Sequence, residues 1–325
     1  EAFILWRLGK GKVLLLYLND LPNSFHNDPS YWLLLGLSLR LQSYPPNQII
    51  NAYERGLSLD PSRCDLHYNL ANILAELNSE LSFYHYSQSL LNDPLQSHVW
   101  HNFGILLNSL DRHVDALFCF KTSLILSPSN SDVWCNLGLA YLAIEEYASA
   151  ERSFLKAIST DESNPCGLTN LGSLLISGRR IDEALRLLES PSTYSVGSSH
   201  ALFNLGICHL LLGRFSTGWK YYEERLNTSL VPSESYPSSG PLLKSLDDAP
   251  LCGDSVTPLI VWAEQGAGDC IQFCRYLLLL QARNIDFEFH CPLNLMPLVS
   301  SWLNPNIRIK ELDSGGASKH NSLHC

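Results

Sequence analysis

The residues with the clearest potential for chemistry lie in one stretch, 262–277 (WAEQGAGDCIQFCRYL), where a glycine-rich turn joins an apolar strand-like run to an apolar helical pattern. Its polar and glycine members are Glu264, Gln265, Gly266, Gly268 and Asp269. Three interpretations are open: a nucleotide-binding turn, a catalytic carboxylate, or a tight structural turn. An ionised carboxylate at the start of a helix is stabilised by the helix dipole and can accept a proton from a hydroxyl group.

The spacing of the glycines argues against a dinucleotide-binding fingerprint. Gly266 and Gly268 match the first half of G-x-G-x-x-G, but the third glycine would be residue 271, which is Ile. Glu288 lies twenty residues beyond Gly268, the distance expected of an acid that binds the ribose. Such an acid belongs at the end of a strand, however, and His290 is nearer to that end than Glu288 is.

Alternating strand and helix patterns surround this turn. We expect strands at 259–264, 285–290 and 307–312, and helices at 269–283 and 293–303, the second helix with an internal proline. Strands that alternate with helices predict a parallel sheet of the doubly wound type. Asp269 would then be the N-cap of the first helix, at the carboxyl edge of the first strand, where open parallel sheets bind ligands.

A second set of candidate residues is a series of asparagines. They stand at the same place in five consecutive units of the sequence, as Asn69, Asn102, Asn136, Asn170 and Asn204. Because asparagine is a mediocre helix former, its recurrence inside a helical pattern calls for a reason. Its amide offers a donor and an acceptor and can hold a peptide backbone without reading side chains. The alternative is that each asparagine bonds to the neighbouring repeat.

These asparagines belong to a repeat with a period close to 34 residues. Similar segments start at residues 32, 67, 100, 134, 168 and 202 (WLLLG, HYNLA, WHNFG, WCNLG, LTNLG and LFNLG). A small residue follows in the second half of each unit, with a bulky one four residues later, as in Ala150 and Phe154. Pro61, Pro94 and Pro128 close three of the units, where a helix must end. Each unit is therefore expected to be two antiparallel helices that pack closely at the small residue.

This pattern resembles the tetratricopeptide repeat, whose W-x-x-L-G signature is matched by Trp134, Leu137 and Gly138. The resemblance covers residues 32 to about 227, with a half-repeat before it, and implies a solenoid whose first helices line a concave groove for another polypeptide. The asparagine series is similar to that of the superhelix in the O-linked N-acetylglucosamine transferases. The first repeat departs from it, with Leu34 at the asparagine position.

The last part of the chain resembles bacterial tetratricopeptide proteins that carry a C-terminal two-domain glycosyltransferase of the B type. The resemblance rests on GWKYYEER at 218–225, the linker rich in Pro and Ser, and the stretch from residue 262. Its Gly-Asp turn is similar to that of the heptosyltransferases. This implies that Asp269 is the general base for the acceptor hydroxyl and that its neighbours contact substrate, namely Glu264, Gln265, Gly266 and Gly268. It also implies a nucleotide-sugar donor, held mainly by a second Rossmann-like domain that this sequence does not contain.

Composition narrows the remaining possibilities. The chain has 325 residues, of which 46% are hydrophobic and 17% charged, as expected of a soluble globular protein with room for two domains. A net charge of -10 argues against binding nucleic acid, and no apolar run is long enough for a membrane span. The ten cysteines show no C-x-x-C pair, which predicts reduced, mostly buried thiols and neither a disulfide framework nor a metal site. Cys270 and Cys274, one helical turn apart, are expected to pack in the core.

The sequence thus predicts an all-α tetratricopeptide-repeat solenoid followed by a partial α/β Rossmann-like domain of the glycosyltransferase B type. The expected domains are the repeats at 1–227, with a partial repeat at 1–29 and six repeats from about 30, a linker at 228–257 and an incomplete Rossmann-like domain at 258–325. We expect a cytoplasmic protein, truncated at both ends, that binds a protein or peptide in its groove and holds no cofactor or metal. Two functions stay open. One is transfer of sugar to a protein or glycan hydroxyl, in which case this fragment is expected to be inactive because it lacks the donor-binding half. The other is a non-catalytic adaptor that mediates protein–protein interaction.

Overall fold

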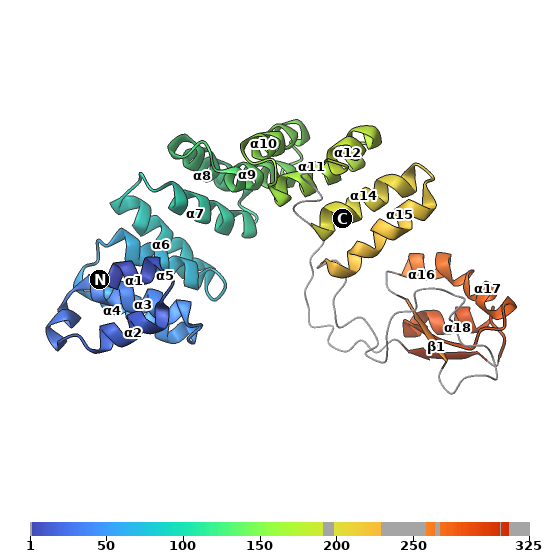
Figure 1. Cartoon of the computed structure of the whole chain (residues 1–325), viewed down its shortest axis with the longest axis horizontal. Helices are drawn as coiled ribbons and strands as arrows, with labels where there is room; N and C mark the ends of the chain where they lie inside the picture. Colours follow the sequence, from blue (N-terminus) through green and yellow to red (C-terminus); the bar gives the residue numbers. More distant parts are fainter. Residues whose placement is uncertain (1, 191–197, 229–257, 264–266, 306, 312–325) are drawn as a thin grey trace. The chain divides into compact units, whose positions relative to one another are not determined.

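The computed structural model describes residues 2–190, 198–228, 258–263, 267–305 and 307–311 (Figure 1). The chain divides into two compact units, Glu1–Glu224 and Arg225–Cys325. The first unit is helical, and the second carries all the strands that the described residues form.

The first unit is a series of helical hairpins. Its α-helices are α1 (Ala2–Arg7), α2 (Gly11–Asn19), α3 (Pro29–Leu41), α4 (Pro46–Leu59), α5 (Cys64–Leu74), α6 (Ser79–Asn92), α7 (Ser97–Ser109), α8 (His113–Leu126), α9 (Ser131–Ala143), α10 (Tyr147–Thr160), α11 (Pro165–Ser177), α12 (Ile181–Leu188), α14 (Ser199–Leu211) and α15 (Phe215–Tyr222). Two short 3-10 helices, η1 (Asn23–Asn27) and η2 (Glu223–Asn227), complete it. The helix pairs predicted from the period are confirmed, from α3–α4 to α14–α15, and α1–α2 forms a further hairpin before them.

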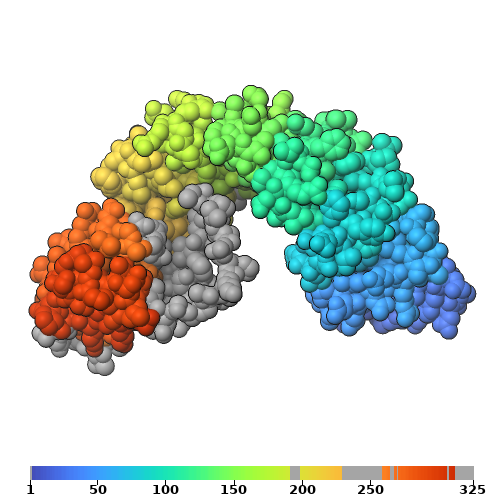
Figure 2. Space-filling view, turned by 180° about the vertical axis from the view of Figure 1, so that it is seen from behind, coloured from blue at the N-terminus to red at the C-terminus, as the bar shows by residue number. Residues whose placement is uncertain are grey.

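Successive hairpins contact their neighbours along the chain, as α8 packs on α9 and α10 on α11. In the space-filling view of the first unit the colours follow one another in sequence order, without mixing (Figure 2). A core of this kind is built from contacts between adjacent repeats only, which is the defining property of a solenoid. Each repeat of the sequence therefore forms one helical hairpin, and the hairpins follow one another in space in the order of the chain.

In several hairpins, a glycine of the first helix lets a bulky side chain of the second helix approach. The rings of Tyr53, Phe120 and Phe154 lie against Gly36, Gly104 and Gly138, respectively. A Cβ added to Gly138 would lie 2.5 Å from the Phe154 ring, well inside ordinary contact distance. Phe154 itself is completely buried. The glycine of the W-x-x-L-G pattern is therefore fixed by packing between the two helices.

The turn between the two helices of a hairpin places one residue in the left-handed region of backbone conformation. At intervals of 34 residues this residue is Asp111, Glu145, Arg179 and Gly213, with φ of 58°, 63°, 61° and 74°. Three of the four are not glycine, although left-handed backbone is costly for other residues. The backbone conformation at this turn is therefore the same in each of these repeats, although the residue type differs.

Prolines and caps mark the turns between hairpins. Pro61, Pro94 and Pro128 each lie two residues beyond the end of a second helix, which confirms their predicted role as helix terminators. After Pro128, the side chain of Asn130 caps α9 by accepting the N–H groups of Asp132 and Val133. These local signals mark the ends of α4, α6 and α8 and the start of α9.

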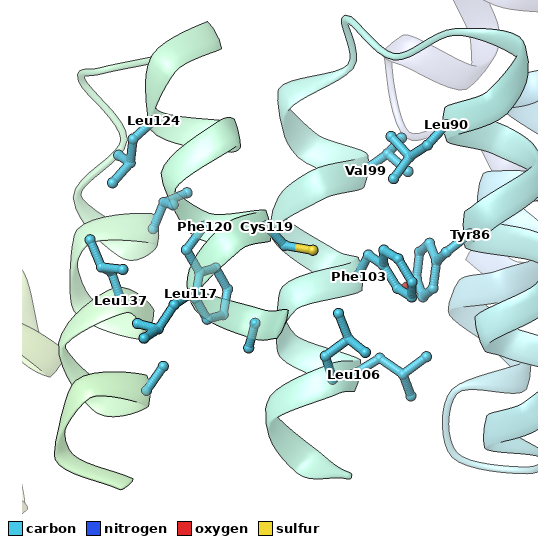
Figure 3. Packing of buried hydrophobic residues seen from close by; sticks show 14 of the residues in the cluster. Tyr86, Leu90, Val99, Phe103, Leu106, Leu117, Cys119, Phe120, Leu124 and Leu137 are labelled. Atoms are coloured by element: carbon cyan, nitrogen blue, oxygen red, sulfur yellow. The ribbon is translucent and has the colours of Figure 1, made fainter. Parts of the chain in front are cut away.

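Buried side chains from adjacent hairpins interlock. Phe103 of α7 stacks near Tyr86 of α6, with ring centroids 5.6 Å apart, and Figure 3 shows Leu117 and Phe120 of α8 close to Leu137 of α9. The small residues of the second helices are fully buried, as predicted, at Ala116, Ala150 and Ala184. Their lack of bulk allows the second helix to lie close to the first.

The second unit is a small parallel sheet with helical connections. Its strands are β1 (Leu259–Trp262), β2 (Phe287–Cys291) and β3 (Arg308–Glu311), in the order β1-β2-β3. The connections contain α16 (Ala267–Cys274), α17 (Leu277–Ala282), the 3-10 helix η5 (Leu293–Leu295) and α18 (Met296–Ser300). Leu259 pairs with Phe287, and Glu288 with Arg308, both in parallel register. The three predicted strands and their parallel direction are confirmed.

The helix predictions in this unit were wrong in detail. The continuous helix expected at 269–283 is broken between α16 and α17, where the Tyr276 N–H bonds to Phe273, three residues back instead of four. The helix expected at 293–303 is divided into η5 and α18, because Pro297 lies in the first turn of α18, where its missing N–H costs nothing. Asp269 is the third residue of α16 and not its N-cap, since the helix begins at Ala267.

No helix within the described ranges is long and apolar enough to cross a membrane.

Candidate functional site

The five asparagines predicted as a binding ladder each lie on the first helix of a hairpin. Asn69 is on α5, Asn102 on α7, Asn136 on α9, Asn170 on α11 and Asn204 on α14. Four of them are partly exposed, and Asn204 is buried. Because the hairpins repeat, the asparagines occupy equivalent positions on successive first helices.

Asn102 illustrates how these side chains are held. Its Nδ2 donates to the Tyr68 hydroxyl and to Oδ1 of Asn72, both at 3.0 Å and both on α5 of the preceding repeat. The Tyr86 hydroxyl donates to the same Asn72 oxygen at 2.6 Å. Two repeats and three helices therefore share one hydrogen-bonded network around the Asn102 amide.

Asn136 makes an equivalent link to α7. Its Nδ2 donates to Nε2 of His101 at 2.8 Å. A ring nitrogen can accept only when the imidazole is neutral. Burial lowers the pKa of His101 below its ordinary value, although the nearby carboxylate of Asp132 acts in the opposite direction. The protein environment therefore keeps His101 in the form that orients Asn136.

Asn204 is held by the backbone of the repeat before it. Its Nδ2 donates to the carbonyl oxygen of Thr169 at 3.1 Å and to Oγ of Ser173 at 3.0 Å. Since a backbone carbonyl can only accept, this contact sets which way the amide points. Asn69 differs, because its Nδ2 donates at 2.8 Å to the Asp65 carbonyl oxygen in its own helix.

Asn170 lies beside a disulfide between Cys135 of α9 and Cys166 of α11. Its Nδ2 contacts the Cys166 carbonyl oxygen at 2.9 Å and Sγ of Cys166 at 3.2 Å. The prediction of reduced cysteines with no disulfide was wrong for this pair. The two positions are 31 residues apart but face each other across adjacent repeats, with Cα atoms 6.2 Å apart, within the range a disulfide spans. No local cysteine motif announces such a contact, because it arises from the stacking of repeats.

The five amides share one property. All five Nδ2 atoms donate within the protein, whereas none of the Oδ1 atoms accepts a hydrogen bond from any residue that the structure describes. None of these oxygens is among the fully buried polar atoms without a partner, so each keeps contact with solvent. Asn102, Asn136 and Asn204 bond to the preceding repeat, which is one of the two alternatives raised by the sequence. In all five amides the nitrogen ties the side chain to the protein, and the oxygen has no donor among the described residues.

The sequence pattern did not single out the contacts that hold the turn before each first helix. Nε1 of Trp100 donates to the carbonyl oxygen of Pro94 at 2.8 Å, and Nε1 of Trp134 donates to that of Pro128 at 3.0 Å. Each proline precedes its tryptophan by six residues, which is the signal that could have revealed the bond. The tryptophan at the start of the repeat signature therefore has a structural role at this turn.

In the second unit, the catalytic prediction falls largely outside the described residues. Glu264, Gln265 and Gly266 lie there, and so does the side chain of Asp269. The backbone of Asp269 belongs to α16, which follows β1 in the chain. Gly268 is exposed, and a Cβ added to it would meet no atom of a described residue within 4 Å. The geometry of this candidate site is therefore known only for the helix that carries it.

Glu288 is buried on the central strand β2 and bound by neighbours on the sheet. Its Oε1 accepts from Nε2 of His290 at 2.7 Å and from Nζ of Lys310 at 2.9 Å. Burial alone would raise the pKa of Glu288, but the hydrogen bonds and charges of Lys310 and His290 outweigh it and hold the pKa below its ordinary value. The carboxylate is thus held on the sheet by His290 and Lys310.

The cysteine pair considered for a metal packs in the core of the second unit. Cys270 and Cys274 are buried with their sulfur atoms 3.9 Å apart, and both join the cluster that contains Phe287 and Cys291. Burial raises the pKa of Cys270 and raises that of Cys274 to about 12. Both thiols therefore stay protonated at neutral pH, as core residues would, and their predicted packing is confirmed.

Comparisons with known proteins identify one repeat and the fold of the helical unit. Residues 131–164, which contain α9 and α10, match the tetratricopeptide-repeat family. No curated protein matches the chain. Among solved structures, the fold is similar to that of PilF from Pseudomonas aeruginosa, at 22% sequence identity and a TM-score of 0.54, over 61% of this chain and 90% of that one. It is also similar to a chain of the Cut9–Hcn1 hetero-tetramer of the APC/C, at 16% identity and a TM-score of 0.56, over 70% of this chain and 45% of that one. Residues 131–164 are therefore a tetratricopeptide repeat, and the helical unit has the fold of a tetratricopeptide-repeat solenoid.

Proposed function

We propose that the helical unit is a protein-binding scaffold that holds an extended segment of a partner polypeptide along the five asparagines. The observation that carries the proposal is the difference between the two polar atoms of each amide. Nδ2 donates a hydrogen bond to the protein, whereas Oδ1 accepts none from the described residues. Acceptors that are already oriented lose little conformational entropy on binding. They contact backbone N–H groups and so hold a chain with little dependence on its side chains.

The proposal is tested with peptides selected on the wild-type protein from a random displayed library. Replacing Asn102, Asn136 and Asn170 by Ala together should weaken the best peptide by about 2–4 kcal/mol, because each net hydrogen bond contributes about 0.5–1.5 kcal/mol. Isothermal titration calorimetry measures the loss. N-methylation of the peptide backbone should weaken binding to the wild-type protein by a similar amount, since it removes the N–H donors without touching the fold of the scaffold.

The matched control replaces three exposed asparagines of second helices, Asn47, Asn51 and Asn92, by Ala. These residues lie on α4 and α6, away from the first helices that carry the asparagine series. Peptide affinity should be unchanged in this control. Equal weakening in both triple variants, or full affinity for the N-methylated peptide, would contradict the proposal.

The second unit supports a second candidate function, sugar transfer from a nucleotide-sugar to a protein or glycan hydroxyl. Support comes from the parallel strand-helix-strand order and from the position of α16, which is the first helix after β1. Parallel sheets bind ligands at the carboxyl ends of their strands. In this proposal Asp269 accepts the proton of the acceptor hydroxyl.

This candidate is tested on the protein at its full natural length, incubated with a panel of nucleotide-sugars and a peptide bound by the scaffold. Asp269→Asn should abolish transfer while peptide binding persists, because the two functions use different units. Transfer that survives Asp269→Asn would remove the role of this carboxylate. Absence of transfer and donor hydrolysis with every sugar would favour the non-catalytic adaptor instead.

A further inference from the structure

A pocket of about 630 Å³ opens between the second helices of two adjacent repeats, α8 and α10. Its apolar floor includes Leu124 and Ile125 from α8 and Trp134, Leu137 and Tyr141 from α9. Leu124 and Leu137 are buried, but Ile125 keeps 79% of its surface exposed. An open pocket of this size with an apolar floor is suited to an inserted side chain of a ligand or partner.

Three cationic side chains stand around this floor. Lys121 is on the α8 side, and Arg152 and Lys156 are on the α10 side. Nζ of Lys121 lies 5.4 Å from the ring centroid of Tyr141, and Nη2 of Arg152 donates to Oγ of Ser149 at 2.9 Å. Within the described parts of the chain, none of the three forms an ion pair with a carboxylate. This concentration of unpaired positive charge stands in a chain whose net charge is -10.

The packing of the repeats does not require these cations. At the equivalent positions 34 residues earlier in the sequence, Lys121 is replaced by Ser87 and Lys156 by Thr122. Arg152 is replaced by Phe118, whose ring lies edge-on to that of Trp100 with the centroids 5.7 Å apart. The two sites share the same helix arrangement, yet the later one has an arginine in place of the phenylalanine. The cations are therefore additions to the repeat and not part of what holds it together.

The pocket lies on a different face of α9 from the asparagine series. At 100° per residue, Trp134, Leu137 and Tyr141 fall on one side of the helix, and Asn136 is turned from their mean direction by about 130°. A partner in the pocket would therefore not compete for the Asn136 side chain. The two surfaces can be tested independently.

We propose that this pocket binds an acidic segment of a partner polypeptide that inserts an apolar side chain between its carboxylates. The positive charges lie on both sides of an apolar floor, so the matching negative charges must be spread along the ligand with an apolar group between them. An acidic peptide has this distribution, whereas a compact phosphate would leave the floor unfilled. A polyanionic nucleic acid is disfavoured by the net negative charge of the chain.

The experiment uses a short fluorescent peptide rich in Asp and Glu around a single Phe, with fluorescence anisotropy as the readout. Lys121→Gln, Arg152→Gln and Lys156→Gln together should weaken its binding by about tenfold, because three partly screened ion pairs are lost. The corresponding peptide of Asn and Gln should bind poorly to the wild-type protein. Raising the ionic strength to about 0.5 M should reduce the affinity for the acidic peptide, since salt screens exposed charges.

Two further variants separate binding from folding and from net charge. Ile125→Glu places a carboxylate on the exposed side of the floor and should repel the acidic peptide, with an unchanged circular dichroism spectrum. A control with the same charge change elsewhere, Arg7→Gln, Lys12→Gln and Lys220→Gln, should bind as the wild type does. No binding of the acidic peptide, equal weakening in the control, or stronger binding of duplex DNA or anionic vesicles through the three cations would overturn the proposal.

Discussion

Replacing Gly138 by Ala tests whether the glycine of the repeat signature is required by packing. The added Cβ would lie 2.5, 2.7 and 2.9 Å from three atoms of the Phe154 ring. Carbon atoms in contact stand about 3.5–4.0 Å apart, so the ring would have to withdraw by about 1 Å. Phe154 is fully buried, which leaves it no free space to enter.

Two opposing effects set the size of the change. Overpacking of a dense core costs about 1–3 kcal/mol. Alanine is the better helix former and offsets about 1 kcal/mol of this in the interior of α9. We therefore expect Gly138→Ala to destabilise the helical unit by about 1–2 kcal/mol, measured by chemical denaturation and by faster amide exchange in α9 and α10.

A double-mutant cycle identifies the cause. In the next repeat, Gly172 faces Leu188 and not an aromatic ring, and a Cβ there would lie 3.0 Å from the leucine. Phe154→Leu should therefore relieve the clash and couple favourably with Gly138→Ala by about 1 kcal/mol. Gly178→Ala is the control, because its Cβ would come no closer than 3.4 Å to any atom. An increase in stability for Gly138→Ala, as helix propensity alone predicts, would refute this reasoning.

Two further predictions concern the disulfide and acid stability. Reduction of the Cys135–Cys166 disulfide, which closes a loop of 31 residues, should lower the free energy of unfolding by about 3–4 kcal/mol. The variant Cys166→Ser should have the same stability as the reduced protein. Alkylation of both cysteines without a reductant would show that the disulfide is absent and would contradict this prediction. Burial, with a smaller contribution from the charge of His67, lowers the pKa of His85 to about 4, and the two Nδ1 atoms are 2.8 Å apart. The stability contributed by this pair is present above the unfolded-state pKa of about 6.5 and is lost as pH falls toward about 4, by about 1–2 kcal/mol after discounting for the partly exposed ring. His85→Asn should flatten this part of the urea stability profile, and an unchanged profile, or a His85 NMR titration near pH 6.5, would count against it.

The asparagine series shows how far sequence reasoning reached into the candidate site. The recurrence of Asn102 and Asn136 at one position in the period is enough to place both residues on the first helices of their repeats. Their partners were not foreseeable, because Tyr68 and His101 lie more than thirty residues earlier and meet them only when adjacent repeats stack.

The second unit was less predictable in its helices than in its strands. A local i-3 hydrogen bond at Tyr276 breaks a helix whose apolar pattern is continuous.

By itself, the sequence determined the repeat period, the three helix ends marked by prolines, the glycine and bulky positions, and the parallel strands. These features depend on local propensity and on short-range periodicity, which a single chain displays directly. Only the tertiary structure decided that Cys135 and Cys166 meet, that the asparagine nitrogens are bound while their oxygens are not, and that three cations gather around one pocket. These are contacts between residues far apart in sequence. They depend on how one repeat is placed against the next, a relation that the sequence pattern of a single repeat does not contain.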